Sequence, residues 1–199
     1  GKNYNDEVKH YRFRLDANLA ELRRELLAGD VPVGDYRYFH IYDPKERMIC
    51  AAAFRERVLH HAVMIVCHPV FERFQTDDSY ASRIGKGQYA ALEKAKTHTR
   101  HYRWFCKLDV RKFFDSIDHE TLYGLLSRRF KDPALLGLFR RIIDSYRTAP
   151  GCGLPIGNLT SQHFANYYMA YADHHVREAL RAPAYVRYMD DMVLWHDDL

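Results

Sequence analysis

The most constraining feature of this chain is a pair of adjacent aspartates inside a strand-like stretch, YVRYMDDMVLW at residues 185–195. Aromatic and β-branched residues lie on both sides of the dipeptide Met189-Asp190, which predicts two antiparallel strands joined by a tight turn. Asp is a favoured turn residue, so a polar loop tip alone would explain the pair. Adjacent carboxylates repel each other, however, and Asp190 and Asp191 would be stabilised by a cation.

A third carboxylate follows a second strand-like segment. Residues 104–110 have the sequence WFCKLDV, which predicts a short buried strand that carries Asp109 near its end. If this strand lies beside the hairpin, Asp109 and Asp190 face each other at one sheet edge. Hard divalent cations relieve such repulsion best, and Mg²⁺ keeps sites free for water and phosphate. We therefore expect nucleotidyl transfer with two Mg²⁺ ions, or Mn²⁺, in which a 3′-hydroxyl attacks and pyrophosphate leaves.

Composition narrows the class of protein. Hydrophobic residues make up 47% of the 199 and charged residues 28%, as in ordinary globular domains. The longest apolar run, residues 62–67, is far shorter than the roughly 20 residues that cross a bilayer. We expect a cytoplasmic protein with no membrane partner, whose four widely spaced cysteines stay reduced. The net charge of +4 permits a nucleic-acid partner, and basic residues cluster with aromatic ones at 100–107.

Periodicity predicts an irregular alternation of helices and strands. Besides the two strand segments above, a hairpin is expected at residues 36–49, interrupted at 43–46. Gly29 and Pro69 are expected to end the first two helices. This order favours an α+β fold with helices packed on an antiparallel sheet, rather than repeated βαβ units. The helices are expected at residues 16–28, 54–68, 88–97, 119–130, 133–146 and 160–180.

Five segments resemble, in order, the motifs of reverse transcriptases from bacterial retroelements. The first two resemble the fingers motifs of that family, the third and fifth its aspartate motifs, and the fourth its template-and-nucleotide motif. The resemblance covers nearly the whole chain, and the shared order argues strongly against chance similarity. The segments are YDPKERMICAAAFRERVLHHAV at 42–63, SYASRIGKG at 79–87, KLDVRKFFDSIDH at 107–119, GLPIGNLTSQHFANYYM at 153–169 and RYMDD at 187–191.

The resemblance implies the right-hand polymerase fold, with fingers and an antiparallel palm sheet packed on helices. We expect the fingers at residues 1–102, with 119–150 packing between fingers and palm, and the palm at 103–118 and 151–199. The chain ends just after the second aspartate motif, so we expect the thumb to be absent. We also expect this piece to be weakly active or inactive, because fingers and palm phosphate contacts alone hold a duplex weakly.

The resemblance also assigns catalytic roles. Asp109, Asp190 and Asp191 are expected as the catalytic carboxylates and, with the Val110 carbonyl, as the metal ligands. Asp191 must point to the other face if its strand is regular. Phe114, five residues past Asp109, is expected as the steric gate that rejects ribonucleotides. A packing role in the core is the alternative for a phenylalanine here.

Contacts to nucleotide and template are implied in the same way. A Lys/Arg pair stabilises the charge of a triphosphate, and a glycine-flanked basic loop suits backbone phosphates. A solvated hairpin tip and a plain surface loop are the alternatives for these two features. Nucleotide binding is expected at Lys45, Arg47, Phe114, Ile156 and Gly157, and template binding at Arg83, Gly85, Lys86, Ser161 and Gln162.

The fourth motif narrows the resemblance further. Most group II intron, retron and retroviral enzymes carry Gln before its Gly, where this chain has Ile156. The sequence IGNLTSQ resembles instead the enzymes of diversity-generating retroelements, in which loss of that Gln accompanies low fidelity opposite template adenines. We expect DNA synthesis on an RNA template from a DNA primer and deoxynucleoside triphosphates, with a small basic accessory protein as a further partner. The alternatives are a defence-type enzyme with untemplated or protein-primed synthesis, and a non-catalytic nucleic-acid-binding module.

Overall fold

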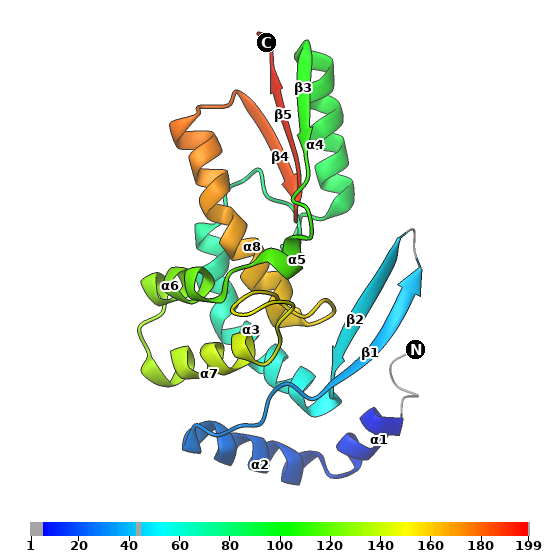
Figure 1. The fold of residues 1–199 in the computed structure, drawn as a ribbon, viewed down its shortest axis with the longest axis vertical. Helices are drawn as coiled ribbons and strands as arrows, with labels where there is room; N and C mark the ends of the chain where they lie inside the picture. The colour runs from blue at the N-terminus through cyan, green and yellow to red at the C-terminus, as the bar shows by residue number, and fades with distance from the viewer. Residues whose placement is uncertain (1–5, 43–44, 199) are drawn as a thin grey trace. The chain divides into compact units, whose positions relative to one another are not determined.

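The structure is a computed structural model that describes residues 6–42 and 45–198 (Figure 1). Asp43 and Pro44, part of the predicted hairpin interruption, lie outside the described residues. Among the residues that are described, no helix is both long and apolar enough to cross a membrane. The elements are α1 (Asp6–Phe13), α2 (Leu15–Ala28), β1 (Tyr36–Tyr42), β2 (Glu46–Ala52), α3 (Phe54–Phe74), α4 (Gln88–His101), β3 (Trp104–Leu108), α5 (Phe113–Ser116), α6 (His119–Arg129), α7 (Pro133–Asp144), α8 (Leu159–His174), the π-helical turn η2 (His175–Ala179), β4 (Ala184–Tyr188) and β5 (Asp191–His196).

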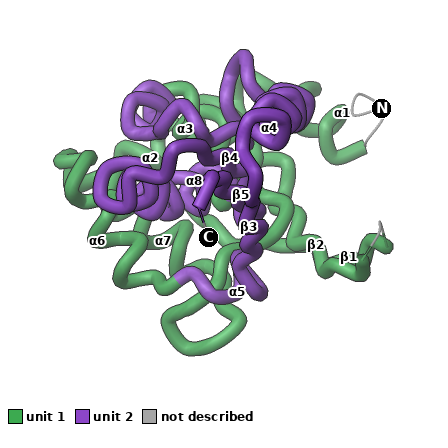
Figure 2. Tube along the Cα trace, turned by 90° about the horizontal axis from the view of Figure 1, so that it is seen from above, with its two compact units in different colours: residues 1–66, 118–161 green, residues 67–117, 162–199 purple. Residues whose placement is uncertain are grey.

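The chain forms two compact units (Figure 2). Unit 1 comprises residues 1–66 and 118–161, and unit 2 comprises residues 67–117 and 162–199. Each unit is therefore assembled from two stretches that are far apart in the sequence. Helices α3 and α8 contribute residues to both units. The assignment of fingers and palm to parts of this chain remains a prediction.

Unit 1 contains a two-stranded antiparallel hairpin, β1–β2, where the alternating sequence predicts one. Its register runs from Tyr36 opposite Ala52 to Tyr42 opposite Glu46. Nearly all of β1 is exposed, whereas β2 becomes buried toward its end, beginning at Cys50. This buried end anchors the hairpin to the rest of unit 1.

Local sequence signals set the helix ends in unit 1. Helix α2 ends where predicted because Gly29 adopts a φ of 77°, in the left-handed region that glycine enters without strain. Asp118 caps α6 by accepting a hydrogen bond from the Thr121 N–H at 2.7 Å. Asp132 caps α7 in the same way, accepting from the Leu135 N–H at 2.7 Å. Each cap satisfies a backbone donor that the first helical turn leaves unpaired.

Unit 2 contains a three-stranded antiparallel sheet in the order β3-β5-β4. Strands β4 and β5 form the predicted hairpin, and Met189-Asp190 is its turn. Strand β3 lies beside β5, with Leu108 opposite Met192. The prediction that the strand before Asp109 neighbours the hairpin is therefore confirmed.

Helix α4 covers one face of this sheet. Val186 and Trp195 on that face pack with Ala91 of α4 in a buried apolar cluster. Because side chains alternate along a strand, Tyr185 and Arg187 lie on the opposite face of β4. All three β4 residues named here are buried, so the strand is enclosed on both faces.

The prediction that residues 104–110 form a buried strand is wrong. Strand β3 ends at Leu108 and all its residues are exposed, with Trp104 at 49% and Phe105 at 65%. The strand lies at the edge of the three-stranded sheet, beside β5. Aromatic and apolar residues occur in edge and central strands alike, so the sequence pattern does not distinguish the two.

The prediction that Pro69 ends a helix is also wrong. Helix α3 continues past Pro69 to Phe74, although proline lacks the N–H that would bond four residues back. In unit 2, the rings of Phe71 and Phe74 each pack on Tyr167 with centroids 5.3 Å apart. Phe71 is buried and Phe74 is half-buried, and the packing of these rings offsets the cost of about 3 kcal/mol that a proline imposes on a helix interior.

Candidate active site

The tip of the β4–β5 hairpin presents Asp190. The turn has two residues, Met189 and Asp190, between the paired residues Tyr188 and Asp191. Met189 has a φ of 57°, in the left-handed region that costs a non-glycine residue about 1 to 2 kcal/mol. Asp190 is half-buried at this tip. A strained turn thus holds one carboxylate at the end of the sheet.

Asp109 reaches the same end of the sheet from β3. Because Leu108 pairs with Met192 in antiparallel register, the next residue, Asp109, emerges beside the start of β5. The side chain of Asp109 lies close enough to the carboxyl group of Asp190 to raise its pKa. The structure therefore brings together two site residues that lie far apart in the sequence.

The electrostatics of this tip are unfavourable for two ionised carboxylates. Burial raises the pKa of Asp190 above its usual range, and the negative charges of Asp109 and Asp191 raise it as well. A hydrogen bond from the Asp190 backbone N–H acts in the opposite direction. The tip therefore carries excess negative charge, which a cation bound by these oxygens would relieve.

Asp191 is oriented differently from Asp190. It begins β5, and strand alternation puts its side chain on the same face as Val193 and Trp195. Its carboxylate lies 3.3 Å from the ammonium group of Lys107, and both side chains are exposed. An exposed pair of this kind contributes at most about 1 kcal/mol to stability. Lys107 therefore offers a partner for Asp191 without locking it in place.

The donor chemistry of the hairpin tip fits a hard divalent cation. Asp109 and Asp190 supply carboxylate oxygens, the ligands that Mg²⁺ and Mn²⁺ prefer. Within residues 6–42 and 45–198, however, no group of three or more Asp, Glu, His or Cys side chains is arranged to hold a metal ion. The arrangement is thus a two-carboxylate one, with Asp191 directed toward Lys107.

A one-turn helix, α5, follows Asp109 and places two phenylalanines differently. Phe113 is buried in unit 2, whereas Phe114 is half-buried, and their ring centroids lie 5.4 Å apart. Lys112, immediately before α5, has a φ of 51°, so the chain turns sharply after β3. The core role therefore falls to Phe113, and Phe114 stays available for the predicted steric gate.

The predicted template loop of unit 2 uses its cations within the protein. Arg83 donates to the Glu72 carboxylate at 2.8 and 2.6 Å and to the Ser79 carbonyl at 2.9 Å. The ammonium group of Lys86 lies 5.1 Å from the ring centroid of Tyr80. Burial lowers the pKa of Lys86, the charge of Arg83 lowers it further, and the nearby acids Asp77 and Glu72 oppose the shift. Template binding by this loop remains a prediction.

The other predicted template residues differ in exposure. Gly85 has a φ of 75°, and the described residues leave the position of a Cβ open there. Gln162 is exposed. Ser161 of unit 1 is 2% exposed and faces the protein interior. Gly85 and Gln162 are therefore accessible to a ligand, whereas Ser161 is not on the surface.

The predicted nucleotide-binding residues Ile156 and Gly157 lie against β2 within unit 1. The Ile156 carbonyl accepts a hydrogen bond from the Cys50 N–H at 2.8 Å. Gly157 has a φ of 114°, and a Cβ at this position would lie 2.9 Å from Cγ2 of Ile49. Gly157 therefore has a packing reason to be glycine, independent of any ligand.

Lys45 and Arg47 belong to the exposed end of the β1–β2 hairpin. Arg47 lies opposite Ile41 in the register. Between the two cations, Glu46 pairs with Nδ1 of His40 at 2.7 Å, so this end of the hairpin carries both signs of charge. A contact of Lys45 and Arg47 with a triphosphate remains a prediction.

The sequence did not single out Lys107 or Arg187. Arg187 and Asp173 form a fully buried ion pair in unit 2, with both side chains at 0% exposure. One signal for Arg187 was present, because it lies between Val186 and Tyr188 in an apolar strand. A charge in such a strand is rarely buried without a partner.

Comparisons with known proteins agree with the motifs. The family described as "Reverse transcriptase (RNA-dependent DNA polymerase)" matches residues 42–199. The group II intron-encoded protein LtrA of Lactococcus lactis subsp. cremoris is 28% identical over 133 residues, which are 63% of this chain and 22% of that protein. Protein YkfC of Escherichia coli (strain K12) is 26% identical over 181 residues, which are 83% of this chain and 47% of that protein. The chain thus spans less than half the length of these curated relatives.

One similar solved structure is the telomerase from Candida albicans in complex with a fragment of telomeric RNA. Its TM-score to this chain is 0.51 at 13% identity, and the match covers 86% of this chain and 39% of that one. At this identity the likeness supports the fold alone. The family match, by contrast, covers well over half of the chain. This chain therefore belongs to the reverse transcriptase family.

Proposed function

We propose that this chain carries out RNA-directed DNA synthesis, extending a DNA primer on an RNA template with deoxynucleoside triphosphates. The observation that carries the proposal is that the register of β3, β5 and β4 brings Asp109 and Asp190 to one end of the sheet, in a chain of this family. Two carboxyl groups close together disfavour each other's ionised form, so the arrangement is costly unless a cation is bound. Nucleotidyl transfer requires such bound cations, which accounts for two carboxylates at one place.

Mg²⁺, with Mn²⁺ as a substitute, is the proposed cofactor. Asp109, Asp190 and the Val110 carbonyl would hold the metal ion. Asp191 would either be a further ligand of the ion or orient the other ligands. Two such ions, when bound, activate the attacking 3′-hydroxyl and stabilise the leaving pyrophosphate. The protein contributes carboxylate oxygens whose positions are set by a two-residue turn and by the end of a paired strand.

Roles in binding the incoming nucleotide are proposed for single residues. Phe114 would lie under the sugar, where a half-buried aromatic ring leaves no space for a 2′-hydroxyl. Lys45 and Arg47 would bind the triphosphate through charge-assisted hydrogen bonds. Ile156 and Gly157 would form the floor beside the base and sugar.

The RNA template is the proposed partner of the loop at residues 83–86. Lys86 would contact backbone phosphates directly, and Gly85 would allow their close approach. Arg83 already pairs with Glu72, so its proposed role is to shape the loop. Gln162 is exposed and would contact the template from the start of α8, with Ser161 supporting it from the interior.

We further propose that the enzyme belongs to the diversity-generating retroelements and works with a small basic accessory protein. Ile156 supports this assignment, because it offers no side-chain hydrogen bond where most relatives carry Gln. The variant Ile156→Gln keeps the local anchor, since the bond to Cys50 uses the main-chain carbonyl. It should raise fidelity opposite template adenine, measured by sequencing the DNA products. An unchanged error rate at adenine would remove this subgroup from the proposal.

The proposed activity is tested by primer extension on an RNA template with the purified protein and Mg²⁺. Asp190→Asn is nearly isosteric and should abolish extension, because the amide cannot supply the missing charge. Glu93→Gln is the matched control, since Glu93 is an exposed carboxylate of the same unit that pairs with Lys96 on α4. Extension by Asp190→Asn at the wild-type rate would refute the proposed function.

A further inference from the structure

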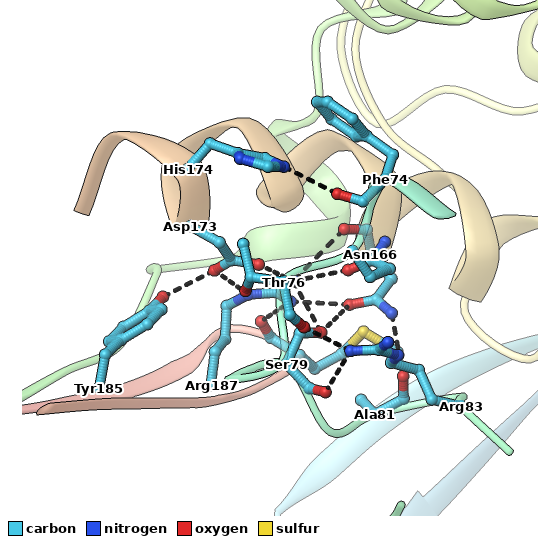
Figure 3. A network of polar contacts seen from close by, with 12 residues as sticks. Phe74, Thr76, Ser79, Ala81, Arg83, Asn166, Asp173, His174, Tyr185 and Arg187 are labelled. Atoms are coloured by element: carbon cyan, nitrogen blue, oxygen red, sulfur yellow. Dashed lines mark hydrogen bonds and ion pairs between the residues drawn. The ribbon is translucent and has the colours of Figure 1, made fainter. Parts of the chain in front are cut away.

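We propose that Arg187 is a positioning residue whose guanidinium holds the Met189-Asp190 turn from inside unit 2, so that Asp190 meets Asp109. The inference rests on the proposed function for its catalytic consequence. Its structural basis is a network of polar contacts that joins β4, α8 and the segment after α3 (Figure 3). Arg187 lies at the centre of that network, and all its partners belong to unit 2.

The guanidinium is oriented by a bidentate ion pair. Nε and Nη2 of Arg187 donate to the two carboxylate oxygens of Asp173, each at 2.6 Å. Asp173 also accepts a hydrogen bond from the Tyr185 hydroxyl at 2.8 Å. Since Asp173 neutralises the guanidinium, any influence of Arg187 on Asp190 acts through geometry rather than through net charge.

The remaining donors of Arg187 reach the turn and its surroundings. Nη1 donates to the Met189 carbonyl at 2.9 Å and to Oδ1 of Asn166 at 2.8 Å. Nη2 also donates to the Ser79 hydroxyl at 3.1 Å. The five N–H groups of arginine form a rigid planar fork, so the pair with Asp173 fixes the direction of Nη1. The Met189 carbonyl belongs to the peptide bond that leads into Asp190, so fixing it restricts the carboxylate that follows.

The main chain of Arg187 is held as well. Its N–H donates to the Asp78 carbonyl at 2.8 Å, and its carbonyl accepts from the Tyr80 N–H at 3.0 Å. Residues 78–80 therefore pair with β4 as a short parallel bridge on the edge that β5 does not use. The side chain that contacts the turn thus starts from a fixed backbone.

The turn needs such support because its backbone is strained. Met189 adopts a left-handed φ of 57° without being glycine, and a relaxed turn would carry Asp190 away from its place. Catalytic groups are sensitive to displacement, since a shift of about 1 Å can lower a rate about 100-fold. A charge-assisted hydrogen bond to the Met189 carbonyl opposes that shift.

A matched pair of variants separates positioning from general stabilisation. Arg187→Lys keeps a positive charge beside Asp173, but a single ammonium group cannot reach both Asp173 and the Met189 carbonyl. Tyr185→Phe removes a hydrogen bond to the same Asp173 and leaves the contact to the turn intact. The stability of each variant is measured by urea unfolding. The order parameter of the Asp190 amide is then measured by NMR, followed by kcat and KM for the deoxynucleotide in primer extension.

We expect Arg187→Lys to lower the order parameter of the Asp190 amide from about 0.85 to below about 0.6, and Tyr185→Phe to leave it unchanged. We also expect kcat of Arg187→Lys to fall by about 100-fold with an unchanged KM. A folded Arg187→Lys protein with a rigid Asp190 amide overturns the inference. If that variant does not fold, Asp173→Asn replaces it, because an amide has one oxygen and cannot accept from both Nε and Nη2, so the direction of Nη1 is no longer fixed and the turn should loosen. An unaltered turn in a folded Asp173→Asn protein then overturns the inference.

The two proposals fail in different ways. The order parameter does not depend on polymerase activity, so it reports on Arg187 even in an inactive protein. Primer extension that survives Asp190→Asn, together with loss of turn order in Arg187→Lys, defeats the proposed function and leaves the positioning role standing. An active protein whose turn is insensitive to Arg187 defeats the positioning role alone.

Discussion

Replacing Gly157 by alanine should destabilise unit 1 through two separable effects. Its φ of 114° lies outside the conformations that side-chain-bearing residues adopt easily, which costs about 1 to 3 kcal/mol. The new Cβ would also lie 2.9 Å from Cγ2 of Ile49 and 3.4 Å from the Cys50 carbonyl. Overpacking of this kind costs about 1 to 3 kcal/mol. We therefore expect Gly157→Ala to lower the free energy of unfolding by roughly 2 to 6 kcal/mol.

Two controls separate the conformational cost from the packing cost in the free energy of unfolding. Gly151 of the same unit has a φ of 71° with open space around a Cβ, so Gly151→Ala should show the conformational cost alone, about 1 to 2 kcal/mol. The double variant Gly157→Ala/Ile49→Ala removes the obstructing Cγ2. A double-mutant cycle should therefore give a coupling energy of about 1 to 3 kcal/mol between positions 49 and 157.

The measurement is urea unfolding of five proteins, with the midpoint and slope fitted for each: the wild type, Gly157→Ala, Gly151→Ala, Ile49→Ala and the double variant. Thermal unfolding offers a second measurement, at about 2 to 4 °C per kcal/mol for a chain of this size. Equal losses for Gly157→Ala and Gly151→Ala, or a coupling energy of zero, would refute the packing argument. A stable Gly157→Ala protein with weakened nucleotide binding would show instead that the glycine serves the ligand.

Three further predictions concern charge and capping. Without divalent metal, Asp190→Asn should raise stability near pH 7, because the folded state raises the pKa of Asp190 and so disfavours its ionised form. For the same reason, wild-type stability should fall as pH rises through the usual Asp range. Urea unfolding at pH 4 and pH 7 in the presence of a chelator measures both effects. Burial and His68 lower the pKa of His163 to about 4, so stability should be lost on acidification from pH 6.5 to 4, by up to about 3 kcal/mol; His163→Gln should flatten that pH dependence. Asp118→Ala and Asp132→Ala should each cost about 1 kcal/mol in thermal unfolding, and serine at either position should recover most of it.

Several parts of the fold were predictable because they depend on residues a few positions apart. The caps at Asp118 and Asp132 bond N–H groups three residues ahead, and Gly29 ends α2 through its own φ. The two-residue turn at Met189-Asp190 follows from alternating strand residues on both sides. The same local patterns carry the ordered motifs, so the family could be recognised before any coordinates were known.

Burial and partnership depended on segments that are distant in the sequence. Trp104 and Phe105 looked like core residues, yet β3 lies at the sheet edge and leaves them exposed. Pro69 looked like the end of a helix, yet rings packed beyond it keep α3 intact. Arg187 looked like one polar residue in an apolar strand, yet one of its partners, Ser79, lies 108 residues away. The free energies of burial and pairing are set by whichever segments come to lie side by side, which a local pattern does not contain.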